Sequence, residues 1–238
     1  MSRNTNLSYF WKGCRNSVPF IFVAGPFGML FGVLGSEGGL SLTQVMTFSF
    51  TVFAGAAQFT ALQLMREEAP TVIVLASALA VNLRVAMYSA SLTPYLGAAP
   101  LWQRALAAYF TVDQSYALSI VQFEQGPEMT LQERVAYFFG TSALIAPLWY
   151  GMTLTGALLG STIPDSWALD FALPLAFLAM IGPMLRTPAH VIAALVSVIT
   201  VLLAGGIPYN LGLLVAGVAG MMAGAWTERY LERRVAEA

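Results

Sequence analysis

Charged residues are scarce in this chain. Only 10% of its 238 residues are Asp, Glu, Lys or Arg, whereas 58% are hydrophobic. Because soluble domains carry roughly 25% charged residues, this composition excludes an ordinary soluble protein and indicates an integral membrane protein with several helices. The formal net charge is −1, so the chain also lacks the basic stripe with which proteins bind nucleic acids.

Cysteine and histidine are nearly absent. The single cysteine, Cys14, excludes an intramolecular disulfide and a multi-cysteine metal site, and His190 is the single histidine. The HExxH and GxxxxGK[ST] motifs of zinc proteases and P-loop ATPases do not occur. An intramembrane enzyme needs a nucleophile–base pair or metal ligands at one depth, so we expect a protein that is not an enzyme and uses no cofactor or metal.

What the chain has instead is a series of apolar runs. A helix needs about 20 apolar residues to cross a bilayer, and the sequence predicts an all-α, polytopic bundle of about eight transmembrane helices, some broken by Gly or Pro. Seven spans is the alternative. We expect residues 1–238 to form a single membrane domain, whose first run is a retained helix and not a cleaved signal. The predicted spans are residues 17–35, 42–65, 71–96, 105–122, 135–160, 168–185, 188–205 and 209–226.

The basic residues predict how this bundle is oriented. With eight spans and both termini in the cytoplasm, nine basic residues lie inside and Arg104 alone lies outside, as the positive-inside rule requires. A seven-span topology places the basic C-terminal cluster on the outside. The nine are Arg3, Lys12, Arg15, Arg66, Arg134, Arg186, Arg229, Arg233 and Arg234.

Two charged residues lie near the middle of predicted spans, namely Arg84 and Asp113. A charge at the bilayer centre costs about 2.5–3.5 kcal/mol on insertion scales, so such residues face a protein interior or a cavity. Because their depths match, we expect them to pair. The pair is either a structural lock between two helices or part of a substrate or proton site.

Further polar groups lie near that depth. Gln58 and Asn82 are candidates for the same site, although hydrogen bonding between helices explains them equally well. On a regular helix Asn82 and Arg84 point about 200° apart. Gly25-Pro26 lies mid-span, where proline removes an amide donor. One reading is a half-helix whose free N–H groups bind a carboxylate; the other is a packing face made by Gly28 and Gly32.

Four segments resemble the AzlC family, the large subunits of bacterial branched-chain amino acid exporters. They are GPFGMLFG, FAGAAQFTALQLM, AVNLRVAMYSASLTPYL and FTVDQSYAL. The resemblance implies export of neutral amino acids, such as valine, leucine, isoleucine or methionine, across the cytoplasmic (inner) membrane. It also implies a second protein, a small AzlD-like membrane subunit.

Together these observations predict a secondary transporter that works by alternating access. The substrate carboxylate is expected on Arg84, on the Gly25-Pro26 amides or on both, and its ammonium on Asp113, with Gln58 and Asn82 as hydrogen-bonding groups. Burying a zwitterion requires that both charges are paired. The alternatives are a structural or regulatory subunit and a channel for small solutes.

Overall fold

The computed structural model describes residues 2–160, 185, 187–207 and 211–236. Every regular element of these residues is helical, which confirms the predicted all-α class. The elements are α1 (Ser2–Ser17), η1 (Val18–Phe20), α2 (Ile21–Glu37), α3 (Leu42–Thr51), α4 (Gly55–Arg66), α5 (Thr71–Leu96), α6 (Leu101–Tyr109), α7 (Asp113–Gln125), α8 (Leu131–Gly160), α10 (Pro188–Leu203) and α11 (Leu211–Ala236).

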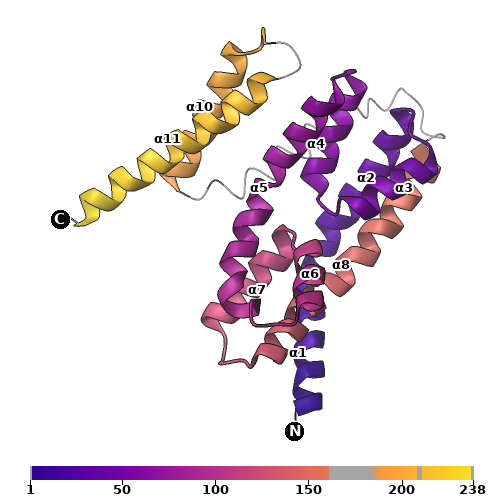
Figure 1. Cartoon of the computed structure of the whole chain (residues 1–238), viewed down its shortest axis with the longest axis vertical. Helices are drawn as coiled ribbons and strands as arrows, with labels where there is room; N and C mark the ends of the chain where they lie inside the picture. Colours follow the sequence, from indigo (N-terminus) through magenta and orange to yellow (C-terminus); the bar gives the residue numbers. More distant parts are fainter. Residues whose placement is uncertain (1, 161–184, 186, 208–210, 237–238) are drawn as a thin grey trace. The chain divides into compact units, whose positions relative to one another are not determined.

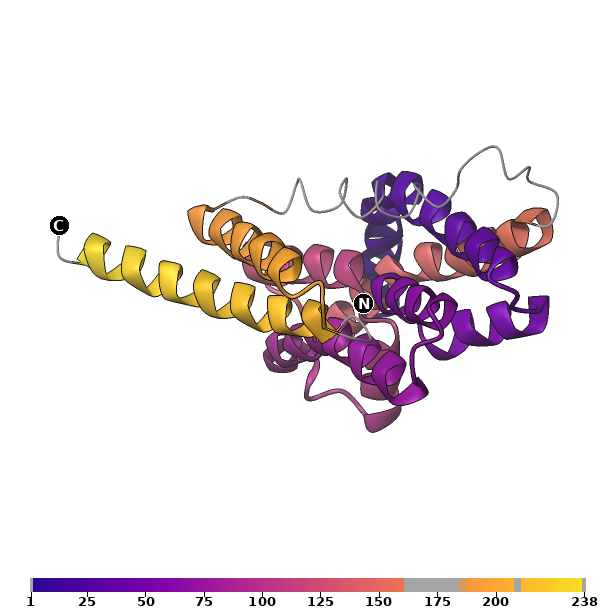
Figure 2. The same ribbon diagram turned by 90° about the horizontal axis from the view of Figure 1, so that it is seen from above.

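The helices group into two compact units, which we describe separately. Among the described residues, the first unit comprises 2–62 and 81–160, and the second comprises 63–80, 185, 187–207 and 211–236. In the second unit α10 and α11 form an antiparallel pair, visible in Figures 1 and 2. Gly220 and Gly224 face Ala193 across this pair, so small residues pack the two helices closely.

Three continuous stretches of the described residues are long and apolar enough to cross a membrane: Thr5–Glu37, Thr71–Leu96 and Leu131–Gly160. They correspond to the predicted spans 17–35, 71–96 and 135–160. The predicted spans 188–205 and 209–226 fall on α10 and α11. The span 168–185 lies, apart from residue 185, outside the described residues.

Glycines bring α2 and α8 into backbone contact. A Cβ atom at Gly32 would overlap the Thr153 carbonyl oxygen, and one at Gly156 would overlap the Met29 carbonyl oxygen. Small residues at such positions let membrane helices approach closely. Gly28 lies against Trp149 and Gly32 against Thr153, so contacts advance in the same direction along both helices and α2 and α8 are parallel (Figure 1). The packing face predicted for Gly28 and Gly32 is therefore confirmed, and Gly156 and Gly160 provide the matching face of α8.

The helix α5 runs antiparallel to α8. Tyr95, at the end of α5, lies under the guanidinium of Arg134 at the start of α8, 5.4 Å from its carbon to the ring centroid. Leu92, Leu96 and Phe138 form a buried cluster at the same level. The predicted topology, in which spans three and five are parallel, is thus wrong, and the reason lies in the two segments between them.

The first of these segments turns back on itself. Residues 52–54 interrupt the helix between α3 and α4, and Phe31 of α2 contacts both Phe48 and Phe59, at 5.5 and 5.6 Å between ring centroids. Phe48 and Phe59 lie on either side of the break, so the chain reverses there. The helix α4 then leads through residues 67–70 to the start of α5. We name α3, residues 52–54 and α4 hairpin 1.

The second segment reverses in the same way. Arg104, near the start of α6, lines a small cleft with Val135, and Phe123, near the end of α7, contacts the ring of Tyr137 at 6.2 Å. Between them, the Tyr109 hydroxyl reaches that of Tyr150 in the middle of α8, at 2.7 Å. Thus α6 runs from the beginning of α8 to its middle and α7 returns. We name α6, residues 110–112 and α7 hairpin 2.

Each arm of a hairpin is too short to cross a bilayer. At 1.5 Å per residue the four arms measure about 14–20 Å, against roughly 30 Å of hydrocarbon. The single crossing helices predicted over 42–65 and 105–122 are therefore wrong. None of these breaks falls at a proline: Pro26, Pro94 and Pro147 all lie inside continuous helices, whereas the break in hairpin 1 ends at Gly55.

The hairpins are parts of two similar blocks of helices, and the helices of one block run in the opposite direction to those of the other. In each block a long helix is followed by a four-residue link, residues 38–41 or 97–100, and then by a hairpin with a three-residue break. The tripeptide Phe-Thr-Val occurs at both breaks: residues 50–52 lead from α3 into the first, and residues 110–112 form the second. Because α2 and α5 run in opposite directions, hairpin 1 enters from one end and hairpin 2 from the other. This is the pattern of an inverted-topology repeat.

Hairpin 2 also reassigns one basic residue. Arg104 lies at the end of the first unit where α8 begins, together with Lys12 and Arg134. We call this the basic end. The prediction that Arg104 lies on the opposite side from Lys12 and Arg134 is therefore wrong.

Candidate functional site

The tips of the two hairpins meet beside the middle of α8. The Tyr109 hydroxyl donates to the Phe50 carbonyl at 2.5 Å, and the rings of Phe53 and Phe110 contact each other at 5.9 Å between centroids. Phe53 and Thr111 are buried. Non-helical backbone at membrane depth is stable where protein surrounds it or where it lines a cavity, and these tips meet that condition.

Two helices begin at this meeting point, α4 at Gly55 and α7 at Asp113. Helix N-termini carry unpaired N–H groups and a partial positive charge. The Asp113 carboxylate lies in the first turn of α7, where that charge stabilises it. One N–H at this end is already satisfied, because Val112 donates to the Ser115 hydroxyl at 2.9 Å.

The predicted pairing of Arg84 and Asp113 is confirmed. Arg84 Nη1 lies 2.9 Å from Asp113 Oδ2, and the side chains are 29% and 34% exposed. The pair joins α5 to the tip of hairpin 2. It leaves two buried atoms without partners among the described residues, Arg84 Nε and Asp113 Oδ1. The pair therefore keeps one donor atom and one acceptor atom without a partner.

Two tyrosines beside the pair were missed by the sequence reasoning. Tyr88 and Tyr116 stack at 4.2 Å between ring centroids with planes 9° apart, and the Tyr116 hydroxyl lies 3.2 Å from Ser91 Oγ. Their spacing is a signal available in the sequence. Tyr88 follows Arg84 by four residues and Tyr116 follows Asp113 by three, so each shares a helix face with a charge.

Gln58 and Asn82 lie near this region without contacting the pair. Gln58 is fully buried in the second turn of α4, and neither its amide oxygen nor its nitrogen has a partner among the described residues. Asn82 Oδ1 is likewise buried and unpaired. Because α5 is helical through Asn82 and Arg84, their side chains point to different faces, as predicted.

The half-helix predicted at Gly25-Pro26 is wrong. Pro26 lies inside α2, which is continuous from Ile21 to Glu37. Gly25 is buried and faces Leu148 and Met152 of α8. No helix begins there, so its amides are not available for a carboxylate. The half-helix ends expected at this point occur instead at the tips of the two hairpins.

Comparison with known proteins assigns the chain to a family. A profile of the AzlC protein family matches residues 19–163, more than half of the chain. The chain belongs to the AzlC family. The match extends from α2 to α8 and so includes both hairpins and the Arg84–Asp113 pair.

Several relatives accompany this match to the AzlC family. An uncharacterized membrane protein of Archaeoglobus fulgidus is 30% identical over 223 residues, which cover 91% of this chain and 94% of that protein. The inner membrane protein YgaZ of Escherichia coli is 24% identical over 178 residues, 72% of this chain and 71% of YgaZ. No solved structure matches the chain. The relatives and the apolar helices together show that this is a membrane protein.

Proposed function

We propose that this protein exports neutral amino acids, foremost the branched-chain ones, across the bacterial cytoplasmic membrane as a secondary transporter. In this proposal it is the large subunit of a complex with a small AzlD-like membrane protein, and it is not an enzyme. Membership of the AzlC family supports a transporter-type role, and the features below support the finer assignment.

The observation that carries the proposal is the incomplete Arg84–Asp113 pair. A zwitterionic amino acid has a carboxylate and an ammonium on one carbon. Arg84 Nε is a donor without a partner and Asp113 Oδ1 is an acceptor without one. The substrate carboxylate binds at Nε and its ammonium at Oδ1, so that all four charges are compensated. Burying charges is tolerable only when they are paired and hydrogen-bonded in this way.

The opposed hairpins support alternating access. In transporters built from inverted repeats, substrate binds near the midplane at discontinuous helices, and the repeats exchange conformations to expose the site to each side. Here both helix breaks and the charged pair lie beside the middle of α8. A channel needs one continuous hydrated path, and the contact between the hairpin tips opposes it.

We further propose that the basic end faces the cytoplasm, with both chain termini on that side. Lys12, Arg104 and Arg134 lie together at this end, a cluster of the kind seen in cytoplasmic loops.

Efflux from preloaded bacteria tests the function. Cells lacking endogenous exporters are loaded with radiolabelled leucine, valine or methionine, with lysine as a control. Expression of the chain with its small partner should accelerate efflux of the neutral amino acids in a saturable manner, and the chain alone should do so far less. Equal efflux with and without the chain would refute transport. Efflux that never saturates would favour the channel.

A further inference from the structure

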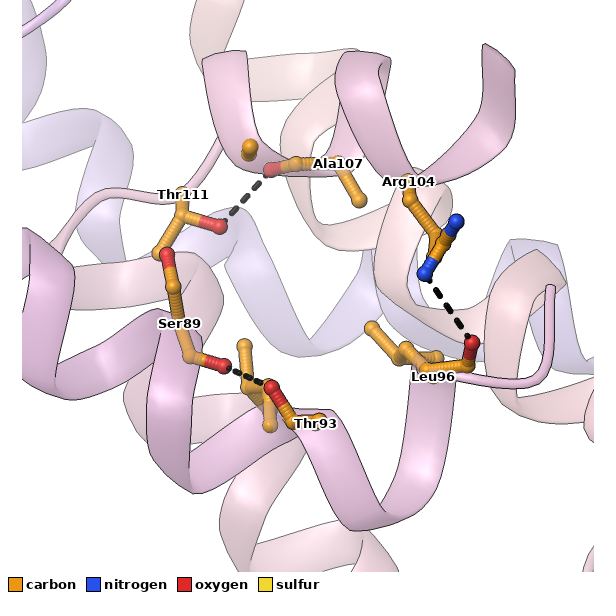
Figure 3. A pocket seen from close by; sticks show the side chains of 9 residues that line it. Ser89, Thr93, Leu96, Arg104, Ala107 and Thr111 are labelled. Atoms are coloured by element: carbon orange, nitrogen blue, oxygen red, sulfur yellow. Dashed lines mark hydrogen bonds between the residues drawn. The ribbon is translucent and has the colours of Figure 1, made fainter. Parts of the chain in front are cut away.

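A cavity of about 170 Å³ lies between α5 and α6 (Figure 3). Its volume is below the roughly 300–1,000 Å³ of pockets for drug-sized ligands, so it suits a small metabolite. The walls are mostly apolar, with leucines from α5 and alanines from α6, and small hydroxyl side chains interrupt them. The lining residues are Ser89, Leu92, Thr93, Leu96, Gly97, Arg104, Ala107, Ala108 and Thr111.

The two ends of this cavity differ in chemistry. Thr111 lies at one end, in the break of hairpin 2, two residues from Asp113. Arg104 lies at the other, at the basic end. Among the described residues Arg104 forms no ion pair, and it makes one long hydrogen bond, to the Gly97 carbonyl at 3.5 Å (Figure 3). Its guanidinium therefore retains donors for an anion.

The corresponding interface of the other block is closed. There α2 meets α3, and Val45 is fully buried against Gly35. The fully buried Phe31 contacts Phe48 edge to face at 5.5 Å. Equivalent helices therefore pack tightly in one block and enclose a cavity in the other. In an inverted repeat such asymmetry is what distinguishes the two access states.

We infer that the α5–α6 cavity is the entrance by which a neutral amino acid passes from the basic end to the Arg84–Asp113 pair, and that Arg104 is its first carboxylate-binding group. The inference rests on the proposed function and adds a second binding position to it. The apolar walls receive the side chain of the substrate while the guanidinium holds the carboxylate. The structure is accordingly open toward the basic end and closed between α2 and α3.

Cysteine labelling tests the route. Replacing the single cysteine by Cys14→Ser gives a background in which Ser89→Cys and Ala107→Cys report on the cavity, and Thr43→Cys reports on the opposite end. In the complex in inside-out and right-side-out vesicles, a membrane-impermeant thiol reagent should modify Ser89→Cys and Ala107→Cys from the basic end only. Leucine should slow both reactions severalfold, and Thr43→Cys should react from the other side without protection.

The outcomes separate the two proposals. Modification of the cavity cysteines from the opposite end, or no slowing by leucine in variants that still export it, overturns the entrance alone. If the parent complex exports no neutral amino acid, the proposed function fails and the entrance fails with it. The labelling still shows to which side the cavity opens.

Arg104→Gln supplies an independent test. The internal leucine concentration for half-maximal efflux should rise about fivefold, as expected for a charge contact of roughly 1 kcal/mol at an exposed group. Maximal efflux should persist, and Arg104→Lys should recover most of the affinity. Arg229→Gln, an exposed arginine of α11, is the matched control. An unchanged half-maximal concentration in Arg104→Gln overturns the role of Arg104.

Discussion

Neutralising the Arg84–Asp113 pair distinguishes a substrate site from a lock between helices. The relevant variants are Arg84→Gln, Asp113→Asn and the double variant. Each single change leaves one charge without its partner at 2.9 Å, whereas the double change removes both charges and leaves two neutral side chains that still hydrogen-bond. The two hypotheses predict opposite behaviour of the double variant.

The magnitudes follow from exposure and geometry. Breaking a fully buried ion pair costs about 3–5 kcal/mol, and exposed pairs contribute about 0–1 kcal/mol. With side chains 29% and 34% exposed, we expect each single variant to lose about 1–2 kcal/mol of stability. If each charge also binds substrate, losing a charge-assisted contact of about 1.5–3 kcal/mol raises the half-saturation concentration about 10- to 100-fold.

Leucine efflux and thermal unfolding of the purified complex measure these effects as a double-mutant cycle. For a substrate site, the double variant should recover stability yet transport worse than either single variant, because both anchors are missing. For a lock, transport should recover together with stability. Recovery of efflux in the double variant would therefore refute substrate binding by this pair.

Three further changes test the frame around the site. Gly32→Ala should lower the free energy of unfolding in detergent by about 1–3 kcal/mol, because the new methyl group overlaps α8 even though alanine favours helices. Gly151→Ala, which has open space around it, should not lower it. Equal stabilities of the two variants would contradict the close packing. Gln58→Leu should raise the free energy of unfolding by about 1–3 kcal/mol, because it removes a buried amide without partners. Leucine efflux should fall. A loss of stability would show that the Gln58 amide is hydrogen-bonded. Tyr109→Phe removes both hydroxyl contacts at the hairpin tips and should lower stability to thermal unfolding by about 1 kcal/mol. Tyr150→Phe should lower stability less, because the bond from Tyr109 to α3 remains. A larger loss in Tyr150→Phe would contradict this order.

The charged pair could be predicted from sequence because lipid makes isolated charges costly. Arg84 and Asp113 stand out in apolar runs, and equal depth was sufficient to expect their contact. The glycine faces were predictable for a similar reason, since small residues at a spacing of four pack helices together. Both inferences depend on local pattern and on one strong energetic constraint.

The hairpins were not predictable in this way. Residues 42–65 are long and apolar enough for one span, and hydropathy cannot distinguish a crossing helix from two half-length helices that return. Phe-Thr-Val, and not proline, occurs at both breaks, and Pro26 lies within an intact helix. What stabilises the breaks is tertiary, chiefly the contact of the tips with each other and with Tyr150 of α8.

The bond from the Tyr109 hydroxyl to the Phe50 carbonyl couples the two sides of the membrane mechanically. Withdrawing either hairpin deprives the other of a partner inside a medium that offers no replacement. In the proposed mechanism, a movement of one hairpin that opens one face therefore alters the hairpin of the opposite face through this single shared contact. In the proposed alternating-access mechanism, this contact disfavours simultaneous opening at both faces and thereby limits ion leakage while a solute crosses.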